Sequence, residues 1–411
     1  MKRVIAYLLA ITALVFAAAS CSNDDGVVVP PPGPGNKTAV DEGNGNGEGN
    51  GEGNGDGTGT TDPGTETGAT AKLCKEEYLG QKPMIIAYLT EYTSASSLDA
   101  SCLTHINYAH GRFKNPKTGD GGIVIAEPTL LKKVVALKEK KPSLKVLLMI
   151  GGWGEHADGF SMMARDAAKR TEFCQSCKAH IDTYGLDGID IDWEYPGGGP
   201  STNGKSNDDP KNFVLVLKEL RETIGDTKII SYASSSSAKY MDWKGAMDYL
   251  DYVNVMTYDM GKPPKHNSPL MKSSTFNQDG CKESVDLHVK AGVPKSRQNL
   301  GVPFYGHGIS PYDSDVKYVS MASILNATTG NYAGKNIRRW DDTAKVPYLT
   351  DAAGTIYLSY DDPESVGYKG KFVKDNGLCG TMFWEFRHDD ANGSMRKALC
   401  SAIYGKESTT E

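Results

Sequence analysis

The sequence lacks a hydrophobic run of the length that a membrane-spanning helix needs. The apolar run at its N-terminus, residues 4–19, has sixteen residues, whereas a spanning helix takes about 20. Two basic residues, Lys2 and Arg3, precede this run, and small residues end it. Basic residues, a short apolar run and small residues, in this order, predict a secretory signal peptide over residues 1–21.

Hydrophobic residues are also nearly absent from residues 22–71, where Gly occupies every second position from 43 to 59. Such a segment cannot bury enough apolar surface to fold, so it predicts a disordered linker of Gly, Asn and acidic residues. A flexible chain of about 50 residues has an r.m.s. reach of roughly 40 Å. A calcium-binding glycine-rich repeat is the alternative, but no apolar residue recurs to build its core.

The larger part of the chain lacks net charge. The formal net charge is -6, of which the signal segment contributes +2 and residues 22–71 contribute -8, so residues 72–411 are near zero. A neutral domain has no basic surface for the phosphates of nucleic acid. Charge therefore argues against a nucleic-acid partner and favours a neutral polymer such as a polysaccharide.

Cysteine is scarce, with eight residues in the chain. Cys174 and Cys177 have no second pair at ligand spacing, which argues against a zinc site. Nothing in the sequence indicates a metal or an organic cofactor. In an exported protein, disulfides are open to the remaining cysteines of the folded part, whose pairing the sequence does not give: Cys74, Cys102, Cys281, Cys379 and Cys400.

Cys21 directly follows the small residues of the signal segment and resembles the acylated cysteine of bacterial lipoproteins, although the usual Leu three residues earlier is Ala18. The resemblance implies an exported protein held by a lipid on Cys21, at an outer membrane or cell surface. An ordinary signal peptide without acylation is the alternative.

From Lys72 onward, short apolar runs alternate with helical patterns, which predicts parallel strands joined by helices. Eight such units over about 340 residues suit a closed (β/α)8 TIM barrel over residues 72–411, with an insertion of about 307–360 after the seventh strand. An open doubly wound sheet is the alternative, but no Gly-rich phosphate loop follows the first run. The eight runs are 84–89, 104–110, 145–151, 187–194, 228–233, 252–259, 299–305 and 379–386.

The fourth run places three acids on one face. Side chains of a strand alternate, so Asp190, Asp192 and Glu194 point one way and the apolar residues between them point the other. Three like charges in a row need protons, hydrogen bonds or a ligand to compensate them. We predict that the pKa of Glu194 is raised, so that it stays protonated and acts as a general acid. A solvated acidic edge and a strand that binds a divalent metal are the alternatives.

Aromatic side chains stand in several of the other predicted strands or just after their C-terminal ends. Active sites of TIM barrels lie at the C-terminal ends of the strands. Aromatic residues at that end, beside three carboxylates, predict a pocket with flat apolar walls, which suits sugar rings. The residues concerned are Tyr88, Trp153, Tyr258, Tyr305 and Trp384.

These motifs resemble the family 18 glycoside hydrolases, the chitinases and their relatives. The run Asp187–Pro196 is similar to the Asp-x-x-Asp-x-Asp-x-Glu signature of that family. Supporting matches are Ile150–Trp153, Met256–Asp259, Gly301–Gly306 and Gly380–Trp384. The resemblance extends over residues 80–404.

The resemblance implies a role for each matching residue. Glu194 protonates the glycosidic oxygen, and the 2-acetamido group of the substrate acts as the nucleophile, with net retention. Asp192 holds the acetamide N–H, Asp190 shares a proton with Asp192, Tyr258 binds the acetamide oxygen, and Trp384 forms the floor. Further positions implied to contact substrate are Tyr88, Trp153, Met256, Asp259 and Tyr305, whereas Asp187 braces the strand.

Three residues depart from the family pattern. Met149 stands where the family often has a Ser near the buried Asp, which leaves the partner of Asp190 open. His110 stands where an aromatic residue is usual, and we interpret it as a packed core histidine. His307 replaces a common Arg, which leaves one substrate contact undecided.

The sequence thus favours hydrolysis of β-1,4-linked N-acetylglucosamine polymers or oligomers, a chitinase activity. An endo-β-N-acetylglucosaminidase that cuts N-glycan cores is a second hypothesis. A sugar-binding protein without catalysis is a third, but such relatives lose the acid, and Glu194 is present.

Overall fold

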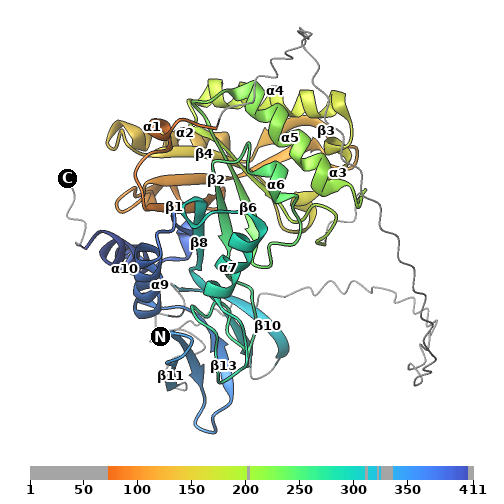
Figure 1. Ribbon diagram of the computed structural model, residues 1–411. Coiled ribbons are helices and arrows are strands. Elements are labelled where there is room, and N and C mark those ends of the chain that lie inside the picture. Colours follow the sequence, from red (N-terminus) through yellow and green to blue (C-terminus); the bar gives the residue numbers. More distant parts are fainter. Residues whose placement is uncertain (1–72, 201–203, 311–312, 322–323, 325–336, 406–411) are drawn as a thin grey trace, which may run out of the picture. The chain divides into compact units, whose positions relative to one another are not determined.

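The computed structural model describes residues 73–200, 204–310, 313–321, 324 and 337–405. Eight parallel strands follow one another in the order β1-β14-β8-β7-β6-β5-β4-β2, and β1 also pairs with β2, so the sheet closes (Figure 1). The predicted (β/α)8 barrel is confirmed, and the open sheet is wrong. The barrel strands are β1 (Met84–Thr90), β2 (His105–Asn115), β4 (Lys145–Gly152), β5 (Gly188–Trp193), β6 (Ile229–Ser235), β7 (Tyr252–Met256), β8 (Gln298–Pro303) and β14 (Gly380–Trp384).

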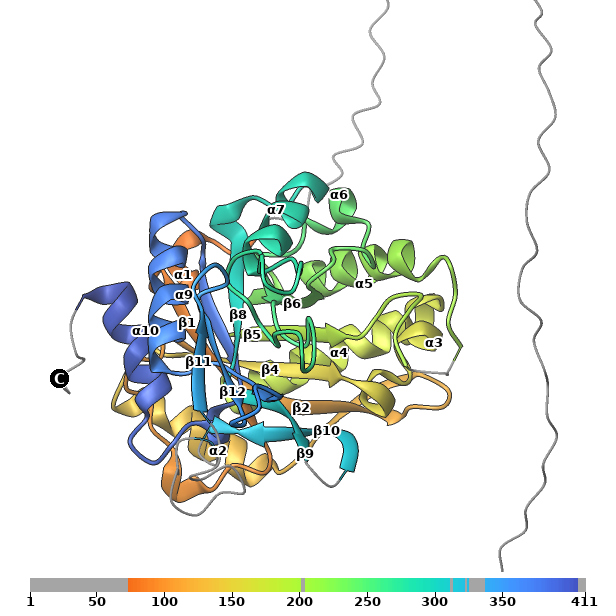
Figure 2. The ribbon, with the colours of Figure 1, turned by 90° about the horizontal axis from the view of Figure 1, so that it is seen from below.

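Helices cover the outside of the barrel, as Figure 2 shows. Their inward faces pack on the outward residues of the strands; for example, the Trp193 ring of β5 stacks on Phe160, with 5.2 Å between ring centroids. The helices are α1 (Glu76–Leu79), α2 (Pro128–Ala136), α3 (Phe160–Ala164), α4 (Ala167–Tyr184), α5 (Asp209–Ile224), α6 (Trp243–Ala246), α7 (Cys281–Ala291), α9 (Pro363–Asp375) and α10 (Ser394–Tyr404).

Two additions extend the barrel. Strand β2 continues beyond it and pairs antiparallel with β3 (Asp120–Ile125), a hairpin that the sequence patterns do not predict. A second, antiparallel sheet follows β8 and lies below the barrel in Figure 1. In the order β10-β9-β13-β12-β11, its strands are β9 (Tyr305–Ser310), β10 (Asp313–Ser320), β11 (Ile337–Asp341), β12 (Val346–Thr350) and β13 (Ile356–Ser359).

The cysteines serve packing. Cys174 and Cys177 lie on the buried face of α4, within the main hydrophobic core. Cys74, Cys281 and Cys379 are also buried thiols that form no disulfide. These five side chains therefore act as small apolar residues of the barrel.

A buried ion pair joins α5 to the N-terminal ends of the strands. Arg221 is 1% exposed and donates to Asp251 Oδ2 at 2.6 Å and to the carbonyl oxygens of Gly225 and Lys228 at 2.9 and 2.6 Å. Asp251 also accepts the backbone N–H of Ile230 at 2.7 Å. The pair lies away from the strand ends that carry the site, so its role is stability.

We expect Arg221→Met to lower the free energy of unfolding by about 3–5 kcal/mol, because the buried carboxylate of Asp251 loses its partner. Urea denaturation measures this loss. Lys218→Met, at an exposed position of the same helix, is the control and should change the free energy of unfolding by less than about 1 kcal/mol. A loss below about 1 kcal/mol for Arg221→Met would contradict the assignment.

Candidate active site

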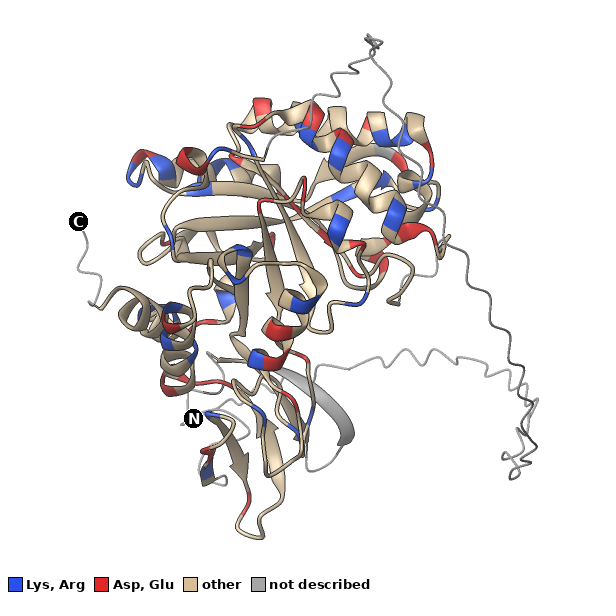
Figure 3. Ribbon diagram, viewed as in Figure 1, with Lys and Arg blue, Asp and Glu red and all other residues tan. Residues whose placement is uncertain are grey.

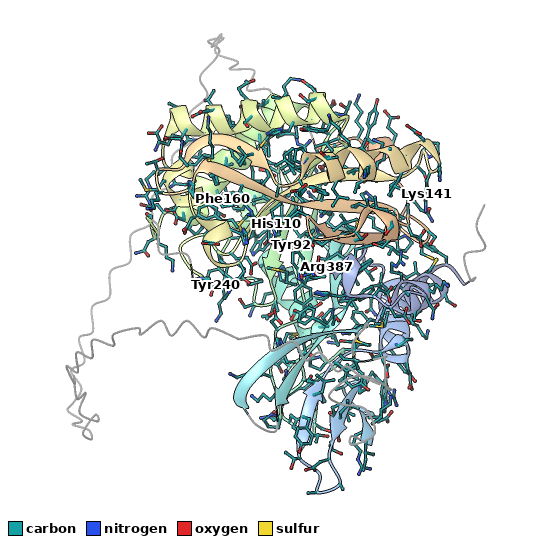
Figure 4. All side chains as sticks on the ribbon, turned by 180° about the vertical axis from the view of Figure 1, so that it is seen from behind. Tyr92, His110, Lys141, Phe160, Tyr240 and Arg387 are labelled. Carbon is teal, nitrogen blue, oxygen red and sulfur yellow. The ribbon has the colours of Figure 1, made fainter. Side chains whose placement is uncertain are left out.

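A cavity of about 790 Å³ opens at the C-terminal ends of the barrel strands. Its walls come from residues at or just after the ends of strands, together with the first residues of the second sheet. The lining includes Thr90, Tyr92, His110, Trp153, His156, Asp192, Glu194, Tyr195, Met256, Tyr258, Asp259, Tyr305, His307, Trp384, Glu385, Arg387 and His388. Figure 4 shows that Tyr92, His110 and Arg387 lie near one another at this end.

Strand β5 and the residue that follows it bring two of the three acids to the cavity. Asp192 and Glu194 both line it and are 5% and 8% exposed, while Asp190 lies deeper and is fully buried. The neighbouring strand passes very close to these acids at Gly151, where a Cβ atom would lie 2.2 Å from the carbonyl oxygen of Asp192. Gly151 also has a φ of +107°, so a side chain is excluded there on two grounds.

Three strands hold Asp190 in place. Its carboxylate accepts hydrogen bonds from Tyr88 of β1 at 2.8 Å, Ser231 of β6 at 2.5 Å and Asn254 of β7 at 3.1 Å. Met149 packs in an apolar cluster and does not contribute to these hydrogen bonds, one of which comes from the hydroxyl of Ser231. Burial raises the pKa of Asp190 to about 6, although these hydrogen bonds oppose the rise.

The two acids at the cavity keep their protons more readily than free carboxyls. Burial raises the pKa of Asp192 well above its ordinary value, and the charges of Glu194 and Asp190 raise it further. Asp192 Oδ1 is buried and has no hydrogen-bond partner in the described part of the chain. Burial also raises the pKa of Glu194, to about 7, with a contribution from Asp259 and an opposing hydrogen bond from Tyr195. Glu194 is therefore poised to give up a proton near neutral pH.

Aromatic side chains border the acids. The Trp384 ring lies 5.7 Å from that of Tyr88, and the Tyr258 ring lies 6.0 Å from that of Tyr305, between centroids. Trp153 is 60% exposed and stands edge-on to Tyr195 at 6.4 Å. The exposed Trp153 and the half-buried Trp384 thus provide two flat surfaces that differ in their exposure.

The second sheet contributes to the site through its first strand. Tyr305 and His307 of β9 both donate to Asp259 Oδ1, each at 2.7 Å. His307 thus lies on the cavity wall and holds an acid that influences Glu194.

Most sequence-predicted residues line the cavity, but three do not. Asp190 and Tyr88 lie behind it; Tyr88, which we expected to contact substrate, is 1% exposed and acts on Asp190. Asp187 precedes β5 and accepts hydrogen bonds from Lys138 Nζ at 2.7 Å and from the backbone of Val146 at 2.8 Å. These contacts tie the N-terminal end of the strand to its surroundings.

The sequence did not place two residues at the cavity. His110, interpreted as a packed core histidine, is buried at 6% exposure, and it also lines the cavity, where Glu91 Oε2 lies 2.8 Å from its Nδ1. Glu385 follows Trp384 and accepts hydrogen bonds from Thr90 at 2.6 Å and Arg387 at 2.7 Å. The sequence does contain one indication of Glu385, since it is an acidic residue directly after Trp384, which was expected to form the floor of the cavity.

The described part of the chain was also searched for charged surfaces, membrane-spanning helices and groups of metal-binding side chains. In the view of Figure 3, Lys and Arg are interspersed with Asp and Glu along the helices. No described helix is both long and apolar enough to cross a membrane. Among the described residues, no three His, Cys, Asp or Glu side chains are grouped so that they could hold a metal ion.

A TIM barrel that presents a carboxyl group with a raised pKa, a buried companion acid and aromatic walls has the features of a glycoside hydrolase. A family model described as "Glycosyl hydrolases family 18" matches residues 84–389, and the chain belongs to this family. It is an enzyme of the chitinase-like glycoside hydrolases.

Individual relatives agree with this assignment. The chain is 32% identical to Chitinase A1 of Niallia circulans, over 78% of this chain and 57% of that relative, and 28% identical to Chitinase B of Serratia marcescens, over 73% and 76%. A solved family 18 N-acetylglucosaminidase from Paenibacillus barengoltzii superimposes with a TM-score of 0.67 at 30% identity, covering 78% of this chain and 99% of that one. The match therefore spans little more than half of the first relative.

Proposed function

We propose that the protein hydrolyses β-1,4-linked N-acetylglucosamine polymers or oligomers by substrate-assisted, retaining catalysis. Glu194 gives its proton to the glycosidic oxygen, and the acetamido oxygen of the same sugar attacks the anomeric carbon from the other face. Asp192 accepts the acetamide N–H and, once its proton has passed to Asp190, offsets the positive charge of the oxazolinium intermediate. Water then opens the intermediate, and Glu194 takes back a proton, which restores the enzyme.

The observation that carries this proposal is the arrangement of Asp192 beside Glu194. Asp192 lines the cavity, and among the described residues its buried Oδ1 has no hydrogen-bond partner, so a turn of the carboxyl group toward the cavity would let a ligand N–H satisfy that oxygen. An intramolecular nucleophile that is held correctly can have an effective molarity of about 10⁵ to 10⁸ M. The task of the protein is then to orient the acetamide, and the Asp190 network supports the strand that does so.

The test is a comparison of substrates. Purified protein is offered chitin oligomers and, separately, a high-mannose glycoprotein, and products are identified by mass spectrometry. We expect cleavage of the oligomers. Release of glycans from the glycoprotein alone would replace the proposal by an endo-β-N-acetylglucosaminidase, and binding without cleavage of either would indicate a sugar-binding protein.

The raised pKa of Glu194 predicts the pH dependence. Because the acid must be protonated, kcat/KM on chitin oligomers should fall about tenfold per pH unit above about 7. Asp259→Asn removes a negative charge that raises the pKa of Glu194, so the fall should begin at a lower pH in this variant. An alkaline limb at the same pH in both proteins would contradict this assignment.

We propose further that the chain is exported and held at a membrane by a lipid on Cys21. This residue and the linker of residues 22–71 lie outside the described residues. Support comes from the order of basic, apolar and small residues before Cys21. Mass spectrometry of the mature N-terminus tests the proposal, and an unmodified terminus at another residue would refute it.

A further inference from the structure

Two histidines face the cavity beside Trp384. His110 of β2 and His156 of the 3-10 turn η3 (Gly154–Ala157) both line it. Their rings stack, with centroids 4.7 Å apart and planes 7° from parallel. Figure 4 places His110 next to Tyr92, at the end of the barrel where the cavity opens.

Glu91 fixes the orientation of the first ring. His110 Nδ1 lies 2.8 Å from Glu91 Oε2, and Arg112 donates to Glu91 Oε1 at 2.5 Å. Burial alone would raise the pKa of Glu91, but the hydrogen bond from His110 and the charges of His110 and Arg112 lower it overall. Glu91 is therefore an ionised acceptor, so His110 Nδ1 carries a proton and its Nε2 is left for the cavity side.

His156 offers further hydrogen-bonding capacity. Burial, followed by the charges of His110 and Arg112, lowers the pKa of His156, so its ring is neutral near pH 7 and has one donor and one acceptor. Within the part of the chain that the structure describes, no group forms a hydrogen bond with either of its ring nitrogens. The stacked pair thus presents polar edges to a cavity that is otherwise walled by aromatic rings.

Trp384 completes the geometry. Its ring centroid lies 6.2 Å from that of His110, and the two planes are inclined by 57°. A pyranose has apolar faces and a rim of hydroxyl groups, so a sugar that lies flat on Trp384 turns its rim toward the neighbouring walls. A few placed polar groups in an apolar cavity fix the orientation of a ligand.

We propose that His110 and His156 form a hydroxyl-binding wall for the sugar that stacks on Trp384, with Glu91 as the positioning residue. This inference rests on the proposed function and names residues that select the substrate. The wall takes a hexosamine unit with free hydroxyl groups along one edge. A Phe at position 110, which has no polar atom in its side chain, could not make these hydrogen bonds.

Binding is measured apart from catalysis in a Glu194→Gln background, by calorimetric titration with chitotetraose. Glu194→Gln/His110→Phe and Glu194→Gln/His156→Ala should each bind about threefold to tenfold more weakly, the effect of one or two lost hydrogen bonds. Glu194→Gln/His180→Phe is the matched control: His180 lies on α4 and bonds the carbonyl of Ile123 at 2.8 Å, away from the cavity lining. Its affinity should stay within twofold.

The outcomes separate the two proposals. If Glu194→Gln itself binds no chitin oligomer, the proposed function fails. If it binds, and both double variants retain the affinity within twofold, the hydroxyl-binding wall is wrong while the proposed function stands. The His156→Ala arm keeps the test decisive if His110→Phe does not fold.

Glu91 is tested in the active enzyme. Glu91→Gln should raise KM about threefold to tenfold and leave kcat within twofold, because it weakens binding of substrate and transition state alike. A purely structural role would instead lower the temperature of unfolding without moving KM, and that result would overturn the positioning role.

Discussion

Glu194→Gln should lower kcat on chitin oligomers by about 10² to 10⁴, the contribution typical of a general acid. Gln has nearly the shape of Glu but has no proton to give at neutral pH. The structure makes the position suitable for this role, because Glu194 is 8% exposed, lines the cavity and has a pKa raised to about 7. A loss of less than tenfold would remove Glu194 from the role of acid.

The matched control is Glu222→Gln, at an exposed position of α5 on the outside of the barrel. This substitution makes the same chemical change and should leave kcat within twofold. Binding of chitotetraose to Glu194→Gln should persist, since the aromatic walls are intact. Loss of both binding and turnover, with a lowered unfolding temperature, would show that the side chain holds the barrel together instead.

Asp192→Asn should lower kcat by about 10² to 10³, the cost typical of removing one group that is preorganised toward developing charge. The amide cannot carry negative charge, so the oxazolinium-like transition state loses its nearest counter-charge. Asp192 is suited to this task because it is buried beside Glu194 and its Oδ1 has no hydrogen-bond partner among the residues that the structure describes.

Asp182→Asn, at an exposed position of α4, controls for the chemical change itself and should leave kcat within twofold. The pH dependence of kcat/KM is a second measurement. Because Glu194 is still present in Asp192→Asn, kcat/KM should still fall at high pH in this variant. An Asp192→Asn enzyme with more than a third of the wild-type kcat would show that the acetamide is stabilised elsewhere.

The barrel was predictable because its strands leave a strong pattern. Buried parallel strands read as short apolar runs, and eight of them alternate with helical segments in the sequence. The alternation of side chains also placed Asp192 and Glu194 on one face of β5, where both reach the cavity. These features depend on local sequence alone.

Contacts between strands were not predictable in the same way. One of the two hydroxyls that bind Asp190 comes from Ser231 on β6, and recognising it requires the register in which Asp190 lies opposite Ser231. The position of His110 depends on Glu91, nineteen residues earlier, at the end of the adjacent strand. A single sequence contains no record of which side chains meet across strands, so both residues lay outside its reach.

The short connection between the two sheets limits how they could be recombined. Only Phe304 separates the last residue of β8 from the first residue of β9. A chimera that exchanges the antiparallel sheet with that of a relative, cut at this junction, would replace Tyr305 and His307, the two side chains that donate to Asp259, with residues of the relative. A graft that keeps both of these contacts unchanged therefore has to begin beyond His307.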